Sequence, residues 1–138
     1  MALRRVLIDT NAYTAFKQGV PEAVAVLRHA PEIALCATVL GELLAGFSCG
    51  TRAARNRREL ADFIASSRVR QLPVDDDTAE YYAALFASLR KKGRPVPTND
   101  LWIAAAALQH GYALFSLDGH FREMDNLIVG SQLEEFLP

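Results

Sequence analysis

The sequence has few cysteines, no long hydrophobic run and no excess of charge of one sign. Its two cysteines, Cys36 and Cys49, lack the spacing of a metal-binding pair, so we expect reduced thiols and a cytoplasmic protein. The apolar stretch 101–108 is far shorter than the roughly 20 residues that span a membrane, and the N-terminus has no signal-peptide pattern. We therefore expect no membrane partner.

The sequence has neither an excess of basic residues nor a glycine-rich phosphate-binding loop. Fifteen basic and sixteen acidic residues give a net charge of −1, which excludes the overall positive charge of many nucleic-acid binders. Gly41, Gly46 and Gly50 neither join a strand to a helix nor precede Lys-Ser or Lys-Thr. Nucleotide-binding folds with a glycine-rich loop are therefore excluded.

What is present is an alternation of short buried strands with helices. The chain of 138 residues, 51% of them hydrophobic, has the size of a single domain spanning 1–138. Its patterns predict strands at 6–8, 33–36, 69–73, 113–116 and 127–129. They predict helices at 12–19, 21–30, 39 to about 50, 51–67, 78–92 and about 99–111. This order predicts a three-layer α/β fold, with a mainly parallel sheet of four to five strands and helices on both faces.

Two local details follow from residue preferences. Thr38, and either Thr98 or Asn99, are expected to cap the helices that they precede. The helical period predicts a buried side for the helix 78–92, made of Tyr81, Leu85, Phe86 and Leu89.

Acidic residues occupy matching places in these elements. Asp9 directly follows the first strand and Asp118 follows the fourth, and the carboxyl ends of parallel strands form one edge where chemistry collects. Asp100 lies in the first turn of an apolar helix and shares its inward face with Ile103. Glu42 lies at the flank of an apolar helical stripe.

Each acid also has a structural explanation: Asp9 as a helix cap, Asp100 as a partner of a helix dipole, Asp118 as a turn residue and Glu42 as a solvated glutamate. Together, however, four carboxylates at one edge repel one another unless a cation lies among them. Oxygen ligands point to Mg²⁺ or Mn²⁺. Such ions activate water and neutralise the charge on a phosphodiester.

Other residues could support this site. Four polar residues, each of which could also serve as a cap or strand end, could orient the carboxylates: Asn11, Thr38, Asn99 and Ser116. Ten of the fifteen basic residues fall between positions 52 and 94, where they could follow a phosphate backbone or form a solvated helix face. Arg94 is the strongest RNA-binding candidate, followed by Lys92 and His120. No aromatic residue is predicted to stack unpaired bases there.

Four segments resemble, in order, the motifs of PIN-domain ribonucleases, and most closely those of VapC toxins from bacterial toxin–antitoxin modules. They are LIDTN at 7–11, VLGELLAG at 39–46, PTNDLWIAA at 97–105 and SLDGHF at 116–121. The resemblance implies a metal-dependent endoribonuclease in which Asp9, Glu42, Asp100 and Asp118 hold Mg²⁺ or Mn²⁺. It also implies homodimers and inhibition by a cognate VapB-like antitoxin peptide.

The sequence departs from this family at His120, where many PIN domains carry a further acid, so the number of metal ions is left open. By the same resemblance, the antitoxin groove is expected between residues 12–16 and 40–47, with Leu44 inside it. Two other functions could use parts of the same pattern. A haloacid-dehalogenase-like phosphohydrolase would need a second aspartate where Asn11 stands, and a catalytically silent PIN-fold interaction module would have no use for four clustered acids.

Overall fold

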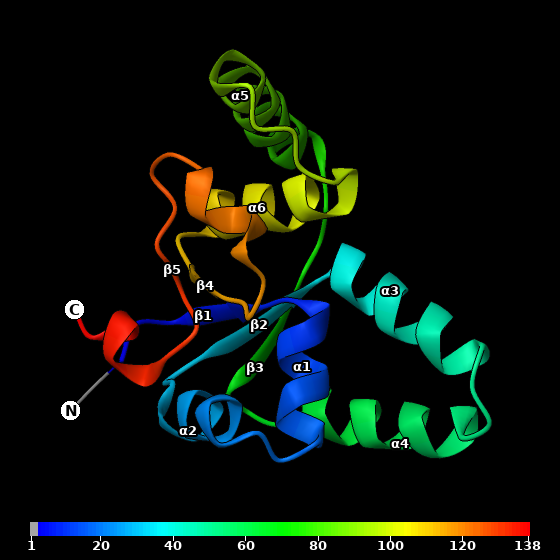
Figure 1. Cartoon of the computed structure of the whole chain (residues 1–138). Coiled ribbons are helices and arrows are strands. Elements are labelled where there is room, and N and C mark those ends of the chain that lie inside the picture. Colours follow the sequence, from blue (N-terminus) through cyan, green and yellow to red (C-terminus); the bar gives the residue numbers. More distant parts are fainter. Residues whose placement is uncertain (1–2) are drawn as a thin grey trace.

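The fold is a five-stranded parallel sheet between two layers of helices, as seen in a computed structural model that describes residues 3–138. The strands lie in the order β3-β2-β1-β4-β5 (Figure 1). Their bounds are β1 Val6–Ile8, β2 Ile33–Cys36, β3 Val69–Leu72, β4 Ala113–Phe115 and β5 Val129–Gly130. All four neighbouring pairs are parallel, which confirms the predicted fold class.

Six α-helices and two short 3₁₀ helices complete the fold. Their bounds are α1 Thr10–Lys17, α2 Pro21–His29, α3 Ala37–Ser48, α4 Ala53–Ile64, α5 Asp76–Lys92, α6 Thr98–His110, η1 Gly119–Glu123 and η2 Leu133–Phe136. In Figure 1, α6 and α5 lie above the sheet, while α1, α2 and α4 lie below it. Helices α3 and α4 form a hairpin that extends away from the strands.

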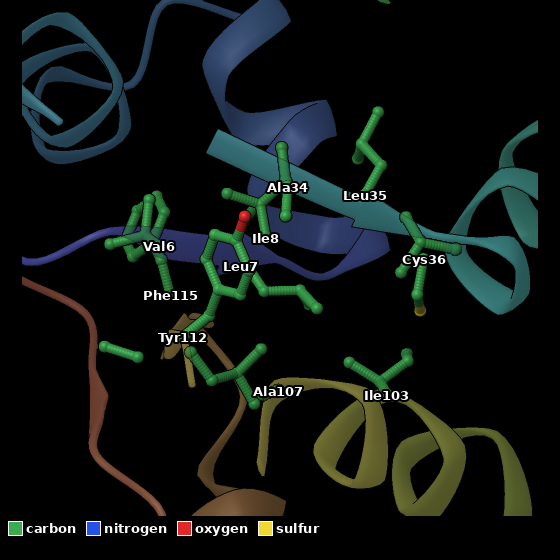
Figure 2. Packing of buried hydrophobic residues seen from close by; sticks show 14 of the residues in the cluster. Val6, Leu7, Ile8, Ala34, Leu35, Cys36, Ile103, Ala107, Tyr112 and Phe115 are labelled. Atoms are coloured by element: carbon green, nitrogen blue, oxygen red, sulfur yellow. The ribbon is translucent and has the colours of Figure 1, made fainter. Parts of the chain in front are cut away.

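The core lies between the central strands and α6. Val6, Leu7 and Ile8 are completely buried, as expected for a central parallel strand that is covered on both faces. Ile103 and Ala107, one turn apart on α6, face these strands (Figure 2). Burying such apolar surface is the main stabilising contribution to the fold.

The strand order places a switch point beside β1. The chain proceeds from β1 to β2 and β3 on one side of β1. Helices α5 and α6 then connect β3 to β4, which lies on the other side of β1. In open α/β sheets, ligands bind outside the carboxyl ends of the strands at such a switch point. Asp9 follows β1, and Ser116 and Asp118 follow β4, so the topology brings them to this edge.

Several local predictions were wrong. Helix α4 ends at Ile64 instead of residue 67, and β5 covers Val129–Gly130 instead of 127–129. Cys36, not Thr38, is the N-cap of α3, and Pro97, not Thr98 or Asn99, is the N-cap of α6; neither cap makes a side-chain hydrogen bond. Burial of these helices in the sheet packing fixes where they begin, so a side-chain cap is dispensable.

The predicted buried face of α5 was also wrong in part. Leu85 and Leu89 are buried as expected, but Tyr81 is 40% exposed and Phe86 is 48% exposed. Helix α5 packs mainly on α6 and lies outside the two layers that touch the sheet. Since one neighbouring helix covers only a narrow stripe, much of the apolar surface of α5 stays in contact with solvent.

Within residues 3–138, no helix is both long and apolar enough to cross a lipid bilayer.

Candidate metal centre

Asp9 is the most enclosed acid of the site. Its residue is only 5% exposed, and it is the N-cap of α1, where Oδ1 accepts a hydrogen bond of 2.8 Å from the backbone N–H of Ala12. Oδ2 accepts a hydrogen bond of 2.5 Å from the Ser116 hydroxyl. The structure confirms that Asp9 caps α1, and the same carboxylate stays a candidate ligand of the site.

Asp118 is tied to the same serine from the other side. Its backbone N–H donates to Ser116 Oγ at 3.0 Å, and its side chain accepts from the backbone N–H of His120 at 2.9 Å, capping η1. Ser116 is buried. Its hydroxyl therefore links the carboxyl ends of β1 and β4 and fixes two of the four predicted acids relative to each other.

Asp100 reaches this edge from the first turn of α6. Its Oδ2 lies 2.9 Å from Nδ1 of His120, and the same nitrogen lies 3.2 Å from Oδ2 of Asp118. The ligand atoms of Asp100, Asp118 and His120 all lie within 4.8 Å of one another, which is close enough to bind one ion. His120, predicted from the sequence as an RNA contact, therefore lies among the acids.

Glu42 is held at the rim of the site by two hydrogen bonds. The Thr10 hydroxyl donates to Oε1 at 2.5 Å, and the Asn99 amide donates to Oε2 at 3.1 Å. The sequence predicted the role of Asn99 but missed Thr10, although its place directly after Asp9 was a usable signal. Thr10 directly follows Asp9 in the chain, and Asn99 directly precedes Asp100. The backbone segments that position these two acids therefore also position the hydrogen-bond donors to Glu42.

Burial and mutual repulsion act on these carboxyl groups. Burial raises the pKa of Asp9; hydrogen bonds from Ser116 and Ala12 lower it, and the carboxylates of Asp100 and Asp118 raise it further. Burial likewise raises the pKa of Asp100 against the lowering effect of His120, and Asp118 and Glu42 add to the increase. The hydrogen bond to Asp100 raises the pKa of His120. A cation among these groups would relieve the repulsion.

Among residues 3–138, the remaining predicted residues make no hydrogen bond or ion pair with the four acids. Asn11 is exposed, and Thr38 is partly buried in the first turn of α3. Lys92 forms an ion pair of 2.6 Å with Asp125, so its charge is already partly neutralised. Arg94 is exposed in the loop before α6.

Comparison with known proteins gives the family. The PIN domain family profile matches residues 6–127. Ribonuclease VapC4 of Mycobacterium tuberculosis is 30% identical over 131 residues, covering 94% of this chain and 98% of that protein. Ribonuclease VapC5 of the same organism is 33% identical over 121 residues, covering 86% of this chain and 87% of that protein.

A solved structure agrees with these sequence relatives. VapBC2 from Rickettsia felis, bound to a DNA fragment from its promoter, matches with a TM-score of 0.78 and 25% identity, over 91% of this chain and 97% of the matched chain. The family profile covers nearly the whole fold, including all four acids. The chain therefore belongs to the PIN-domain family, within its VapC group.

Proposed function

We propose that this protein is a VapC-type endoribonuclease toxin, a single cytoplasmic PIN domain that hydrolyses RNA phosphodiester bonds with Mg²⁺ or Mn²⁺ and is inhibited by a VapB-like antitoxin. The observation that carries this proposal is the convergence of Asp9, Glu42, Asp100 and Asp118 at one sheet edge, where burial and neighbouring carboxylates raise the pKa of two of them. The VapC4 and VapC5 relatives bear the name ribonuclease.

The donor set fits a hard divalent cation. Carboxylate oxygens are the ligands that Mg²⁺ and Mn²⁺ prefer, and the acids carry more negative charge than nearby donors compensate. Asp9, Asp100 and Asp118 would hold the ion, with Glu42 at the rim. Imidazole nitrogen suits transition metals better than Mg²⁺, so a His120 ligand would favour Mn²⁺. A bound ion of this kind supplies an activated water and stabilises negative charge on the scissile phosphate.

The chain's own residues fix the site. Ser116 and the Ala12 N–H hold both oxygens of Asp9, and Thr10 and Asn99 hold both oxygens of Glu42. Supporting bonds of this kind keep ligand groups oriented before substrate binds. The Nδ1 atom of His120 lies against Asp100 and Asp118, so its other ring nitrogen, Nε2, is the one that would donate a proton or bind a phosphate oxygen.

The two alternative functions have less support. A haloacid-dehalogenase-like enzyme needs a second aspartate two residues after its nucleophile, whereas Asn11 is exposed on α1. A silent interaction module would gain nothing from an acid whose pKa is raised by burial and then by neighbouring carboxylates, because uncompensated charge destabilises the fold.

Cleavage of a mixed RNA pool by the antitoxin-free protein tests the proposal. We expect cuts with Mg²⁺ or Mn²⁺, none with chelator, and none by Asp100→Asn, whose fold is checked by circular dichroism. Calorimetric titration with Mn²⁺ should show binding to the wild type and much weaker binding to Asp100→Asn. Cleavage that persists in chelator, or that Asp100→Asn retains, would contradict the metal-dependent mechanism.

The antitoxin is proposed to bind between α1 and the α3–α4 hairpin. A cavity of about 400 Å³ lies there, and residues of mixed chemistry line it: Tyr13, Thr14, Lys17, Gln18, Phe47, Arg52, Arg55, Asn56 and Glu59. Phe47 lies in the predicted groove, whereas Leu44 is not among the lining residues and packs partly against the core. Tyr13 and Phe47 supply aromatic surface. Lys17 and Arg55 share Glu59 as their partner, so the lining keeps a net positive charge that suits an amphipathic helix with acidic residues.

Copurification with the antitoxin encoded beside this gene tests that location. We expect Phe47→Asp to weaken capture while cleavage of RNA by the isolated variant persists. Leu44→Glu serves as a second variant, with circular dichroism as the check on folding. Undiminished capture by both folded variants would move the groove elsewhere. Sedimentation of the wild type tests the proposed homodimer in the same series.

A further inference from the structure

A second pocket lies between the end of α5, the loop 93–97 and the first turns of α6. Its volume is about 230 Å³. The lining residues come from three consecutive segments of the chain: Phe86, Arg90, Gly93, Arg94, Pro95, Val96 and Leu101. Drug-sized ligands occupy pockets of about 300–1,000 Å³, so this pocket suits a smaller group, such as one flat heterocycle.

The lining combines apolar surface with unpaired positive charge. Phe86 is 48% exposed, although an aromatic side chain gains free energy when it is covered. None of the lining residues is acidic, and within residues 3–138 no carboxylate forms an ion pair with Arg90 or Arg94. The matching ligand is therefore anionic and carries an apolar, planar part.

The pocket and the candidate metal centre both take residues from the first turn of α6. Leu101, which lines it, directly follows Asp100 in the first turn of that helix. An aromatic stack supports the pocket from behind: Tyr82 lies 6.4 Å from Phe86 and 4.3 Å from Trp102, measured between ring centroids. These packed rings hold α5 against α6, so Phe86 is presented from a rigid support.

We propose that this pocket binds one unpaired nucleotide of a single-stranded RNA segment, beside the phosphate that is cleaved. The base lies against Phe86 and Pro95, and Arg90 and Arg94 contact the flanking phosphates. The inference rests on the ribonuclease function proposed above and adds the pocket that receives a base. Bases in a duplex are stacked and paired, so only loops, bulges or single strands can offer one to such a pocket.

Charge favours RNA over a second copy of this chain as the occupant. A protein partner would have to supply acids for both arginines or bury them unpaired, which is costly. RNA supplies a phosphate on each side of every base, and base stacking on an aromatic ring tolerates different sequences. If a second copy of the chain fills the pocket instead, the sedimentation experiment below will show it.

Fluorescence anisotropy in chelator, which separates binding from cleavage, tests the proposal. The probe is a labelled single-stranded RNA pool about ten nucleotides long, within the span of about 4–16 nucleotides of single-strand binders; a second probe of the same length is abasic. Phe86→Ala should weaken binding of the RNA about fivefold to 150-fold and leave the abasic probe unaffected. Phe86→Tyr should restore binding.

The arginines should behave differently from Phe86. Arg94→Ala should weaken both probes alike, because phosphate contacts do not depend on the base. Tyr81→Ala and Arg28→Ala remove an exposed aromatic ring and an exposed cation outside the pocket. Both controls should bind the RNA like the wild type.

Three results would overturn the proposal. If the wild type binds and cleaves RNA while Phe86→Ala and Arg94→Ala are unchanged, the nuclease stands and the pocket has another purpose. If Phe86→Ala converts a dimer into a monomer in sedimentation without a base-specific loss, the pocket is a subunit contact. If the wild type neither binds nor cleaves any RNA, both this inference and the proposed function fail.

Discussion

The hydroxyl of Ser116 donates a hydrogen bond of 2.5 Å to Oδ2 of Asp9, across 107 positions of the sequence. Both residues are buried. Ser116 directly follows β4, and Asp9 directly follows β1. Because these strands are parallel neighbours, their carboxyl ends bring the two side chains together. This bond fixes the deepest acid of the site.

Ser116→Ala should therefore impair the site without removing a ligand. The loss leaves a buried oxygen of Asp9 without its donor, which raises the pKa of that carboxyl group further. We expect a roughly 10–100-fold loss of metal affinity or cleavage rate and a stability loss of about 1–3 kcal/mol. Manganese titration and urea denaturation measure the two effects. Ser67→Ala, at an exposed serine, is the control; equal behaviour of the two variants would rule out a positioning role.

Thr10→Val should act on Glu42 alone. The change keeps the shape of the side chain but removes the donor at 2.5 Å from Glu42 Oε1, so the carboxylate loses one of its two fixed positions. We expect about tenfold weaker cleavage at limiting metal, with a smaller loss at saturating metal. Thr14→Val, one turn later on α1 and bonded only to a backbone carbonyl, should cleave normally. A loss shared by both variants would indicate damage to the helix.

The stability of the protein in chelator should fall as pH rises from about 5 to about 8. The pKa values of Asp9, Asp100 and His120 are all raised in the folded state. Such groups bind protons more tightly when folded, so protonation stabilises the fold. This stabilisation is complete below the ordinary pKa, about 3.9 for an aspartate and about 6.5 for a histidine, and it is lost as pH rises from that value through the higher pKa of the folded state.

Urea denaturation at several pH values measures this slope. Saturating Mg²⁺ should flatten or reverse it, because the ion binds the deprotonated carboxylates. Asp9→Asn should reduce the slope in chelator. Below about pH 4 the trend should turn, since hydrogen bonds from Gln109 and Thr78 lower the pKa of Asp75, which then loses its stabilising charge. Stability that rises with pH in chelator would contradict the repulsion among the acids.

Two glycine substitutions should have opposite effects on stability. A Cβ atom at Gly130 would come within 2.7 Å of Glu135 Cβ and 2.9 Å of Phe136 Cζ, and Phe136 is completely buried. Gly130→Ala should therefore cost about 1–3 kcal/mol. At Gly41, inside α3, an added Cβ meets nothing within 4 Å, so Gly41→Ala should stabilise by about 0.5–1 kcal/mol. Thermal unfolding compares the two, and equal shifts would contradict the packing around Phe136.

Much of the site was predictable because its backbone signals are local. The run Val6-Leu7-Ile8 predicts a buried strand, and Asp9 after it predicts both a helix cap and a site acid. Asp100 was assigned to the inward side of α6 from the spacing of its apolar neighbours. Together with the parallel order of strands, these signals placed the acids at one edge. Local patterns could not say what each carboxylate touches.

The sequence by itself therefore determined the element order and the parallel sheet, and it named the candidate acids, since strand length, helical period and residue type act over a few positions. Tertiary structure alone decided that Ser116 bonds Asp9, that Thr10 supports Glu42 and that His120 lies between Asp100 and Asp118. It also decided that Phe86 stays exposed, because α5 packs mainly on α6. Contacts between distant residues depend on how elements pack, and the periodicity of a single helix does not show how many neighbours will cover it.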